Sequence, residues 1–289
     1  MNMALKLTKD GHEIVAWNRS YEKTESFVSE GGRGVSSVED LLKSLETPRI
    51  IWVMLPAGEA TDEMLGKLLA LAEPGDLIIN GANDLYKNTE KWAEKFKAKN
   101  ILFLGIGVSG GLIAATEGYP LMVGGDQSAF ETIKPALESL SKPNGGYQYF
   151  GPGGSGHYVK MVHNAIEYGI MQSIGEGLEL LHSGPYENMD LVKVTGLWNH
   201  GTLLSGFLME RTQEALEQDP KLESIKGYVD DTGEARWAVQ VALKHNIPLS
   251  VITQSLYTRY LSRQDDSFSA RAVAAMRKAF GGHAVKEKK

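Results

Sequence analysis

The chain has 289 residues, a length that accommodates two domains with hydrophobic cores of their own. Hydrophobic residues make up 42% and charged residues 23%, as in an ordinary globular protein, and the net charge of −6 offers no basic surface for nucleic acid. The absence of cysteine excludes disulfides and thiolate chemistry and agrees with a cytoplasmic location. No apolar run approaches the length of a membrane span, so we expect no membrane partner.

Short runs rich in β-forming residues alternate with helical patterns in the first half of the chain. The predicted strands cover residues 12–17, 49–54, 76–80 and 101–105, and the predicted helices lie near 21–31, 58–72, 86–98 and 127–141. This alternation is typical of an α/β fold with a parallel, doubly wound sheet of the Rossmann type.

The character of the sequence changes after the glycine-rich residues 151–156, which we interpret as a turn between domains. Long helical patterns follow near 156–184, 187–200, 203–218, 232–246, 248–262 and 267–281. We therefore predict one domain over residues 1–151 and an all-α domain over residues 152–289.

A polar cluster stands out on the first helix of the second domain. At about 100° per residue, Lys160, Asn164 and Glu167 fall within roughly 60° of one another, flanked by His163 and Tyr168. Polar residues on one face are often only a solvated surface. Lys160 and Glu167, however, are two turns apart, roughly 10 Å along the axis, so they do not form the usual i,i+4 ion pair of exposed helices. A base, an amide and an acid on one face suggest proton transfer.

Three motifs carry a resemblance to a known family. Residues 160–172, Lys-x-x-His-Asn-x-Ile-Glu-Tyr-Gly-x-Met-Gln, resemble the substrate helix of the decarboxylating 6-phosphogluconate dehydrogenases, within the β-hydroxyacid dehydrogenase superfamily. Residues 107–111 resemble the family's substrate-carboxylate loop, and residues 277–283 resemble its C-terminal tail. The resemblance covers nearly the whole chain, and the length suits the short form of the family rather than the long form, whose helical domain is duplicated.

The resemblance implies oxidative decarboxylation of 6-phosphogluconate to ribulose 5-phosphate and carbon dioxide, the oxidative step of the pentose phosphate pathway and of gluconate utilisation. Lys160 would take the proton of the 3-hydroxyl, which requires its pKa to fall from about 10.4 toward neutrality. Asn164 and His163 would hold the reacting oxygen and hydroxyls, and Glu167 would protonate carbon 1 of the enediol. No metal is needed, and the seven histidines include no His-x-x-x-His pair.

The resemblance also places a phosphorylated sugar acid among residues from both predicted domains. Asn83 would lie between nicotinamide and substrate. Arg259 would bind the phosphate through its planar, permanently charged guanidinium group. Arg277 and His283 would reach into a neighbouring subunit of a homodimer or homotetramer. The full set of expected substrate residues is Asn83, Ser109, Gly110, Gly111, Tyr168, Arg259, Arg277 and His283.

Residues 80–83 depart from the family's usual Asp-Gly-Gly-Asn. Asn80 replaces the aspartate and Ala82 replaces the second glycine. If that glycine normally adopts a positive φ, Ala82 would be strained or the loop would shift.

The predicted cofactor is NADP, with NAD as the alternative. Just after the predicted strand over residues 12–17, which matches the second strand of the family's fold, Arg19 stands where an acidic residue would bind a ribose 2′-hydroxyl, and an arginine accommodates a 2′-phosphate. Arg19 could instead cap a surface turn, and the apolar residues near 54 could be core. The expected cofactor residues are Asn18, Arg19, Ser20, Met54, Leu55, Pro56 and Asn83.

The first domain lacks the usual opening of a dinucleotide-binding fold, a strand followed by Gly-x-Gly-x-x-Gly. Residues 1–11 instead read as the helix that follows that loop, so roughly a dozen residues of the family pattern have no counterpart. The missing strand normally lies within the sheet, so its neighbours would lack backbone pairing. Either the numbering begins at an internal methionine of a longer protein, the explanation we favour, or this is a variant that has lost tight cofactor binding.

Two alternative functions remain open at this point. A non-decarboxylating dehydrogenase of the 3-hydroxyisobutyrate type would give Glu167, Tyr168, Arg259 and the residues of the tail little to bind. A non-catalytic sugar-phosphate binding protein would explain the absent phosphate loop, and NADP titration would distinguish it from an enzyme.

Overall fold

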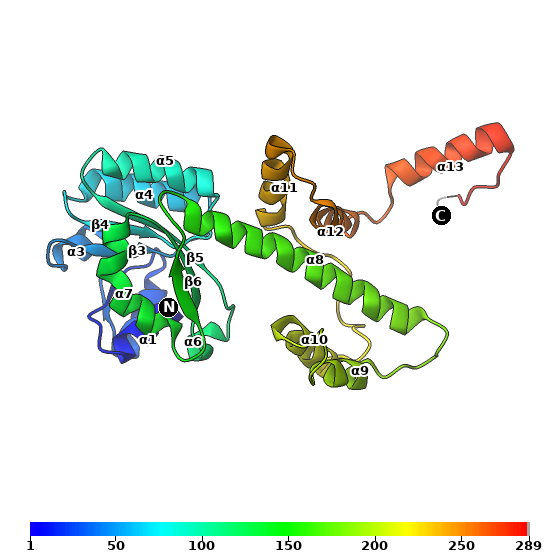
Figure 1. Ribbon diagram of the computed structural model, residues 1–289, viewed down its shortest axis with the longest axis horizontal. Helices are drawn as coiled ribbons and strands as arrows, with labels where there is room; N and C mark the ends of the chain where they lie inside the picture. The colour runs from blue at the N-terminus through cyan, green and yellow to red at the C-terminus, as the bar shows by residue number, and fades with distance from the viewer. Residues whose placement is uncertain (288–289) are drawn as a thin grey trace. The chain divides into compact units, whose positions relative to one another are not determined.

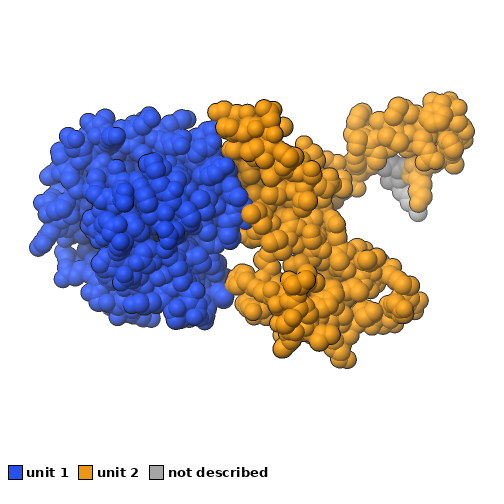
Figure 2. Space-filling model, viewed as in Figure 1, with its two compact units in different colours: residues 1–163 blue, residues 164–289 orange. Residues whose placement is uncertain are grey.

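The computed structural model describes residues 1–287, in two compact units, residues 1–163 and 164–289 (Figure 2). The boundary between the units falls inside one long helix, α8, Ser155–Ser183. The last two residues of the second predicted domain, Lys288 and Lys289, lie outside the described residues.

Unit 1 is an α/β fold, as predicted from the alternating pattern (Figure 1). Its helices before α8 are α1 Asn2–Lys9, α2 Tyr21–Ser29, α3 Val38–Lys43, α4 Glu59–Leu71, α5 Tyr86–Lys97, α6 Ala114–Glu117 and α7 Gln127–Ser141. Its strands are β1 Val15–Ala16, β2 Arg33–Gly34, β3 Ile50–Val53, β4 Leu77–Asn80, β5 Leu102–Val108, β6 Pro120–Gly125 and β7 Gly146–Tyr149.

Five strands form the main sheet, in the order β3-β4-β5-β6-β7. Strands β3, β4 and β5 are parallel, with Val53 paired to Asn80 and Asn80 to Gly105, which confirms the predicted parallel core. Strand β6, which the sequence analysis did not predict, runs antiparallel to β5. The connection over residues 109–119 explains this direction, because a parallel return needs a longer crossover.

Two hydrophobic cores cover the opposite faces of this sheet, since alternate residues of a strand point to opposite sides. On one face, sheet residues such as Ile79 and Leu104 pack with α7 and with Leu7 of α1. On the other face, residues such as Ile78 and Phe103 pack with α3, α4 and α5. The sheet is therefore sandwiched between helices, which leaves the ends of its strands for a binding site.

Strands β1 and β2 form a separate parallel pair, and within residues 1–287 no ladder joins β1 to β3. Strand β1 covers only two of the residues predicted over 12–17. The flanking Ile14 and Trp17 pack against the two cores of the main sheet, so side-chain contacts hold β1 where hydrogen bonds do not.

All the regular secondary structure among the described residues of unit 2 is helical. After α8 come α9 Leu191–Trp198, α10 Phe207–Gln218, α11 Glu234–His245, α12 Ser250–Leu261 and α13 Phe268–Gly281 (Figure 1). Each lies within or close to a predicted helical range, and α13 buries none of its residues. Among the described residues, no helix is both long and apolar enough to cross a membrane.

Candidate active site

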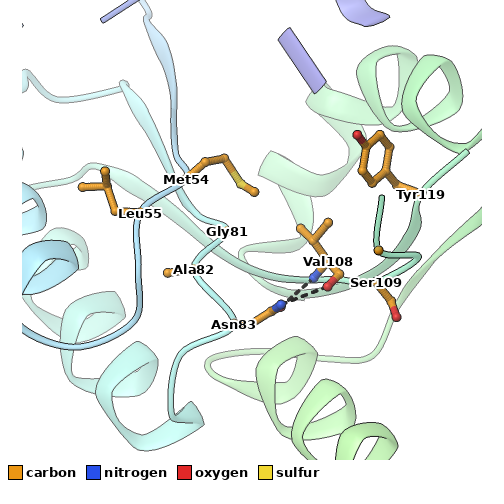
Figure 3. A pocket seen from close by; sticks show the side chains of 9 residues that line it. Met54, Leu55, Gly81, Ala82, Asn83, Val108, Ser109 and Tyr119 are labelled. Carbon is orange, nitrogen blue, oxygen red and sulfur yellow. Dashed lines mark hydrogen bonds between the residues drawn. The ribbon is translucent and has the colours of Figure 1, made fainter. Parts of the chain in front are cut away.

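A pocket opens where β3, β4 and β5 end in unit 1 (Figure 3). Ligands of open α/β sheets bind at this carboxyl edge of the parallel strands. Several of the residues predicted to bind cofactor or substrate line it. The lining residues are Met54, Leu55, Gly81, Ala82, Asn83, Val108, Ser109, Gly111 and Tyr119.

Asn83 is fixed to the end of β5 by both ends of its side-chain amide. Its Nδ2 donates to the Val108 carbonyl at 2.9 Å, and its Oδ1 accepts from the Val108 N–H at 2.8 Å, as the dashed lines of Figure 3 show. Asn83 has a positive φ of 51°, a conformation that asparagine tolerates. Ala82 is not among the described residues with positive φ, so the strain considered for it does not arise.

Asn80 and Asp84 stabilise the same loop through hydrogen bonds. The fully buried Asn80 accepts from the Ala82 N–H at 3.1 Å and donates through Nδ2 to Asp84 Oδ2 at 3.4 Å. Burial raises the pKa of the Asp84 carboxyl. An aspartate at position 80 would face a second buried carboxylate, so the amide of Asn80 suits its neighbour.

The Ser109-Gly110-Gly111 turn follows β5 and carries two residues at positive φ, 102° at Gly110 and 58° at Gly111. The backbone N–H of Ser109 continues the β5–β6 ladder by donating to the Pro120 carbonyl at 3.0 Å. Its hydroxyl accepts from Lys160 Nζ, also at 3.0 Å. The structure thus brings Lys160 to the end of β5, beside the pocket.

Lys160 is buried, with 5% of its surface exposed, and the absence of a side chain at Gly107 leaves the space that it occupies. A Cβ on Gly107 would lie 2.4 Å from Lys160 Cβ, so any larger residue there would displace the lysine. One turn earlier in α8, a Cβ on Gly156 would lie within 2.6 Å of backbone atoms of Met122, Gly105 and Gly124. The first turns of α8 therefore rest directly on β5 and β6.

His157 is a buried residue of this helix that the sequence analysis did not single out. Its Nδ1 lies 2.6 Å from the hydroxyl of Thr89 on α5. Burial lowers the pKa of His157 to about 4, so the ring is neutral at physiological pH. Its position one turn before Lys160 was visible in the sequence, but its contact with Thr89 was not.

The polar residues beyond Lys160 on α8 have different surroundings. His163 is exposed, whereas Asn164 and Glu167 are partly buried. In unit 2, Asn164 Nδ2 donates to Glu234 Oε1 at 2.9 Å. Glu234 begins α11 and was not predicted as a site residue, because nothing local in the sequence marks it.

Tyr168 and Arg259 form a stacked pair in unit 2. The Arg259 guanidinium lies 3.3 Å from the centre of the Tyr168 ring, and its Nη1 donates to the Asp230 carbonyl at 2.8 Å. The Tyr168 hydroxyl lies 3.1 Å from the hydroxyl of Thr232. The expected phosphate-binding arginine is therefore held on an aromatic platform.

Arg277 and His283 are exposed, and the structure does not bring them to the other candidates within unit 2. Arg277 lies on α13, and the His283 ring stands edge-on to Phe280, with ring centres 6.3 Å apart.

The predicted 2′-phosphate residues form an ordered turn after β1. The Asn18 side chain accepts from the Ser20 N–H at 3.0 Å, and the Asn18 N–H donates to Thr24 Oγ1 at 3.1 Å. Arg19 is exposed on this turn, which fits the binding of an anion from solvent. Pro56, like Met54, is exposed after β3. Within residues 1–287, no group of three or more His, Cys, Asp or Glu side chains could hold a metal ion.

Two family models together match almost the whole chain. The NAD binding domain of 6-phosphogluconate dehydrogenase matches residues 1–153, and the C-terminal domain of 6-phosphogluconate dehydrogenase matches residues 156–289. The chain is 38% identical over 279 residues to the NAD(+)-dependent, decarboxylating 6-phosphogluconate dehydrogenase of Haloferax volcanii, which covers 96% of this chain and 92% of that protein. The chain belongs to the 6-phosphogluconate dehydrogenase family.

Solved structures agree with this family membership and confirm the expected fold. The Plasmodium falciparum 6-phosphogluconate dehydrogenase, solved alone, with NADP+ and with 6-phosphogluconate, aligns with a TM-score of 0.83 and 32% identity. It covers 100% of this chain, which spans 64% of its length. A 3-hydroxyisobutyrate dehydrogenase of Mycobacterium tuberculosis aligns at 18% identity with a TM-score of 0.70, covering 96% of this chain and 94% of that one, which shows a shared fold alone.

Proposed function

We propose that this chain catalyses the oxidative decarboxylation of 6-phosphogluconate to ribulose 5-phosphate and carbon dioxide, with reduction of NADP or NAD. The observation that carries the proposal is the buried Lys160, which contacts Ser109 at the edge of the strand-end pocket. Dehydrogenation of a bound hydroxyl needs a base and fixed groups that orient the substrate. Lys160 would be the base, and Asn83, hydrogen-bonded to β5, would be one such fixed group.

Lys160 acts first as the base. Its neutral amine takes the proton of the 3-hydroxyl and becomes an ammonium group. The bound nicotinamide supplies the acceptor for the hydride that leaves carbon 3. The ammonium group of Lys160 then donates to the new carbonyl oxygen, which gathers negative charge as the carboxylate departs as carbon dioxide.

Glu167 completes the proposed reaction, and His163 and Asn164 bind hydroxyl groups of the substrate. Glu167 delivers a proton to the carbon that has lost its carboxylate, so the enediol becomes the ketose product. These residues share α8 with Lys160.

The substrate's two anionic ends are proposed to bind different elements. The carboxylate accepts from the Ser109 hydroxyl and from the backbone N–H groups of Gly110 and Gly111, because the N–H of Ser109 is bonded to Pro120. The phosphate binds Arg259, and Tyr168 serves as the platform that orients the guanidinium. Arg277 and His283 would complete this phosphate site in a neighbouring subunit.

We further propose that the chain works as a homodimer or homotetramer in the cytoplasm, on a small phosphorylated sugar acid, without nucleic acid or membrane. The exposed apolar side chains of α13 support an oligomer, because such surface is usually covered by a partner. These side chains are Phe268, Val273, Met276 and Phe280. Residues 1–151 would bind the dinucleotide, preferably NADP through Asn18, Arg19 and Ser20, and residues 152–289 would serve substrate binding and assembly.

The test is reduction of NADP, and separately of NAD, followed by absorbance with 6-phosphogluconate or 3-hydroxyisobutyrate as substrate. We expect turnover with 6-phosphogluconate and faster turnover with NADP. Turnover only with 3-hydroxyisobutyrate would replace the proposal with the non-decarboxylating alternative. Calorimetric binding of 6-phosphogluconate without turnover would show a binding protein, and the absence of both would refute the assigned substrate.

A further inference from the structure

Glu234, the first residue of α11, is a buried carboxylate bonded to Asn164 of the proposed substrate site and linked through Thr232 to Tyr168. Only 9% of its surface is exposed. Its Oε1 accepts from Asn164 Nδ2 at 2.9 Å, and its Oε2 accepts from the Thr232 hydroxyl at 2.6 Å. A buried carboxylate is costly unless it is hydrogen-bonded, so these bonds stabilise both the acid and its partners.

The contact with Glu234 determines which way the amide of Asn164 points. An ionised carboxylate can only accept hydrogen bonds, so the group of Asn164 that faces it must be the NH₂ group. The carbonyl Oδ1 then occupies the other branch of the amide. Without such an acceptor-only neighbour, the two ends of an asparagine amide can exchange by a simple flip.

The second oxygen of Glu234 orders a chain of hydroxyl groups in the same way. The Thr232 hydroxyl donates its proton to Glu234, so toward the Tyr168 hydroxyl at 3.1 Å it can only accept. The Tyr168 hydroxyl accepts from the Thr232 N–H at 3.1 Å, and its own proton has two acceptors, Thr232 Oγ1 and Asp231 Oδ1 at 3.5 Å. Its ring is thereby held under Arg259, and its hydroxyl is occupied within the protein.

We propose that Glu234 is a positioning residue that turns Asn164 into a hydrogen-bond acceptor for a substrate hydroxyl. The inference rests on the proposed function, because it assumes that Asn164 binds a polyhydroxylated substrate. Asn164 Oδ1 accepts a hydroxyl proton, whereas a flipped amide would present an NH₂ donor instead. The same carboxylate, through Thr232, keeps Tyr168 in place beneath Arg259.

The first test compares Glu234→Ala with Glu234→Gln. Glu234→Ala removes both acceptors, and we expect kcat/KM for 6-phosphogluconate to fall about tenfold to a hundredfold. Glu234→Gln keeps one oxygen that can still accept from Asn164 Nδ2, so its loss should be several-fold smaller. Equal losses in the two variants would contradict the proposed role of the acceptor.

The second test reverses the hydrogen bond. Asn164→Asp alone places two carboxylates in contact and should lower kcat/KM strongly. In Asn164→Asp/Glu234→Gln, the glutamine NH₂ donates to Asp at position 164, which still offers an oxygen to the substrate. The double variant should therefore recover at least about tenfold over Asn164→Asp. A double variant no better than Asn164→Asp would overturn the proposal.

A third measurement separates positioning from stability and does not depend on turnover. The side-chain NH₂ signals of Asn164, assigned by their loss in Asn164→Asp, should shift in Glu234→Ala in a nitrogen–proton NMR spectrum. Unchanged signals would overturn the contact.

If the wild-type chain does not turn over 6-phosphogluconate, the proposed function fails, while the NMR result still decides whether Glu234 holds Asn164. A loss of activity in Glu234→Ala that is just as large in an Asn164→Ala background would mean a merely structural role.

Discussion

Lys160 is the residue on which the proposed chemistry depends most directly. Replacement by glutamine keeps a polar side chain beside Ser109 but removes the base. We expect Lys160→Gln to lower kcat by about a hundredfold to ten-thousandfold, the usual contribution of a general base, with less effect on substrate binding. Steady-state kinetics would measure this, with Lys142→Gln at an exposed lysine as the control. A variant that retains most of its kcat would exclude Lys160 as the base.

His157 should make the stability of the protein depend on pH. Its pKa is lowered from 6.5 to about 4 in the folded state, so between these values the unfolded chain binds a proton that the folded chain does not. Stability contributed by the neutral ring is thus present above pH 6.5 and is lost as the pH falls toward 4, by about 3 kcal/mol. Urea unfolding of wild type and of His157→Gln from pH 7 to pH 4 would test this. The same slope in both proteins would contradict it.

Site residues that lie close together in sequence could be predicted, and those joined by long-range contacts could not. Helical spacing was enough to place Lys160, Asn164 and Glu167 on one side of α8. Glu234 lies far along the chain from Asn164, and no periodicity links them. The sequence analysis considered a positive φ at Ala82. The backbone instead adopts it at Asn83, whose side-chain amide is hydrogen-bonded to Val108.

At the scale of elements, glycine decides how closely α8 approaches the sheet. Gly156→Ala would place a methyl group against backbone atoms of β5 and β6, which cannot move aside easily, and should cost about 1–3 kcal/mol. Gly175→Ala, in the same helix, meets nothing within 4 Å and should stabilise by up to about 1 kcal/mol. Thermal or urea unfolding would measure both. Equal changes in the free energy of unfolding for the two variants would show that the backbone contacts at Gly156 do not exclude a methyl group.

The helices of unit 2 and strands β3 to β5 were predicted from the sequence, whereas strands β2, β6 and β7 were not. The helices of unit 2 and strands β3 to β5 have a clear periodicity or a compact apolar run. Strands β2 and β7 carry too few residues or too little hydrophobic character to be distinguished from loops. Strand β1 is shorter than predicted because β2 is its one pairing partner among the described residues, over two residues.

At the scale of the whole molecule, the proposed oligomer should depend on α13. Val273 and Phe280 are two turns apart and exposed by 51% and 78%. Val273→Asp/Phe280→Asp would place charges in a buried interface and should shift the protein toward monomer. Sedimentation velocity would measure this, with Val28→Asp on α2, exposed by 46%, as the control. A wild-type chain that is monomeric at all concentrations would contradict the oligomer.

The central claim is that one site both oxidises 6-phosphogluconate and releases its carboxylate. The most direct measurement follows reduced nicotinamide and carbon dioxide together, using 6-phosphogluconate labelled with carbon-13 at carbon 1. We predict equal molar amounts of both products, with the label in carbon dioxide, and loss of both in Lys160→Gln. Reduced nicotinamide without labelled carbon dioxide would contradict the account, because it would show a dehydrogenase that does not decarboxylate.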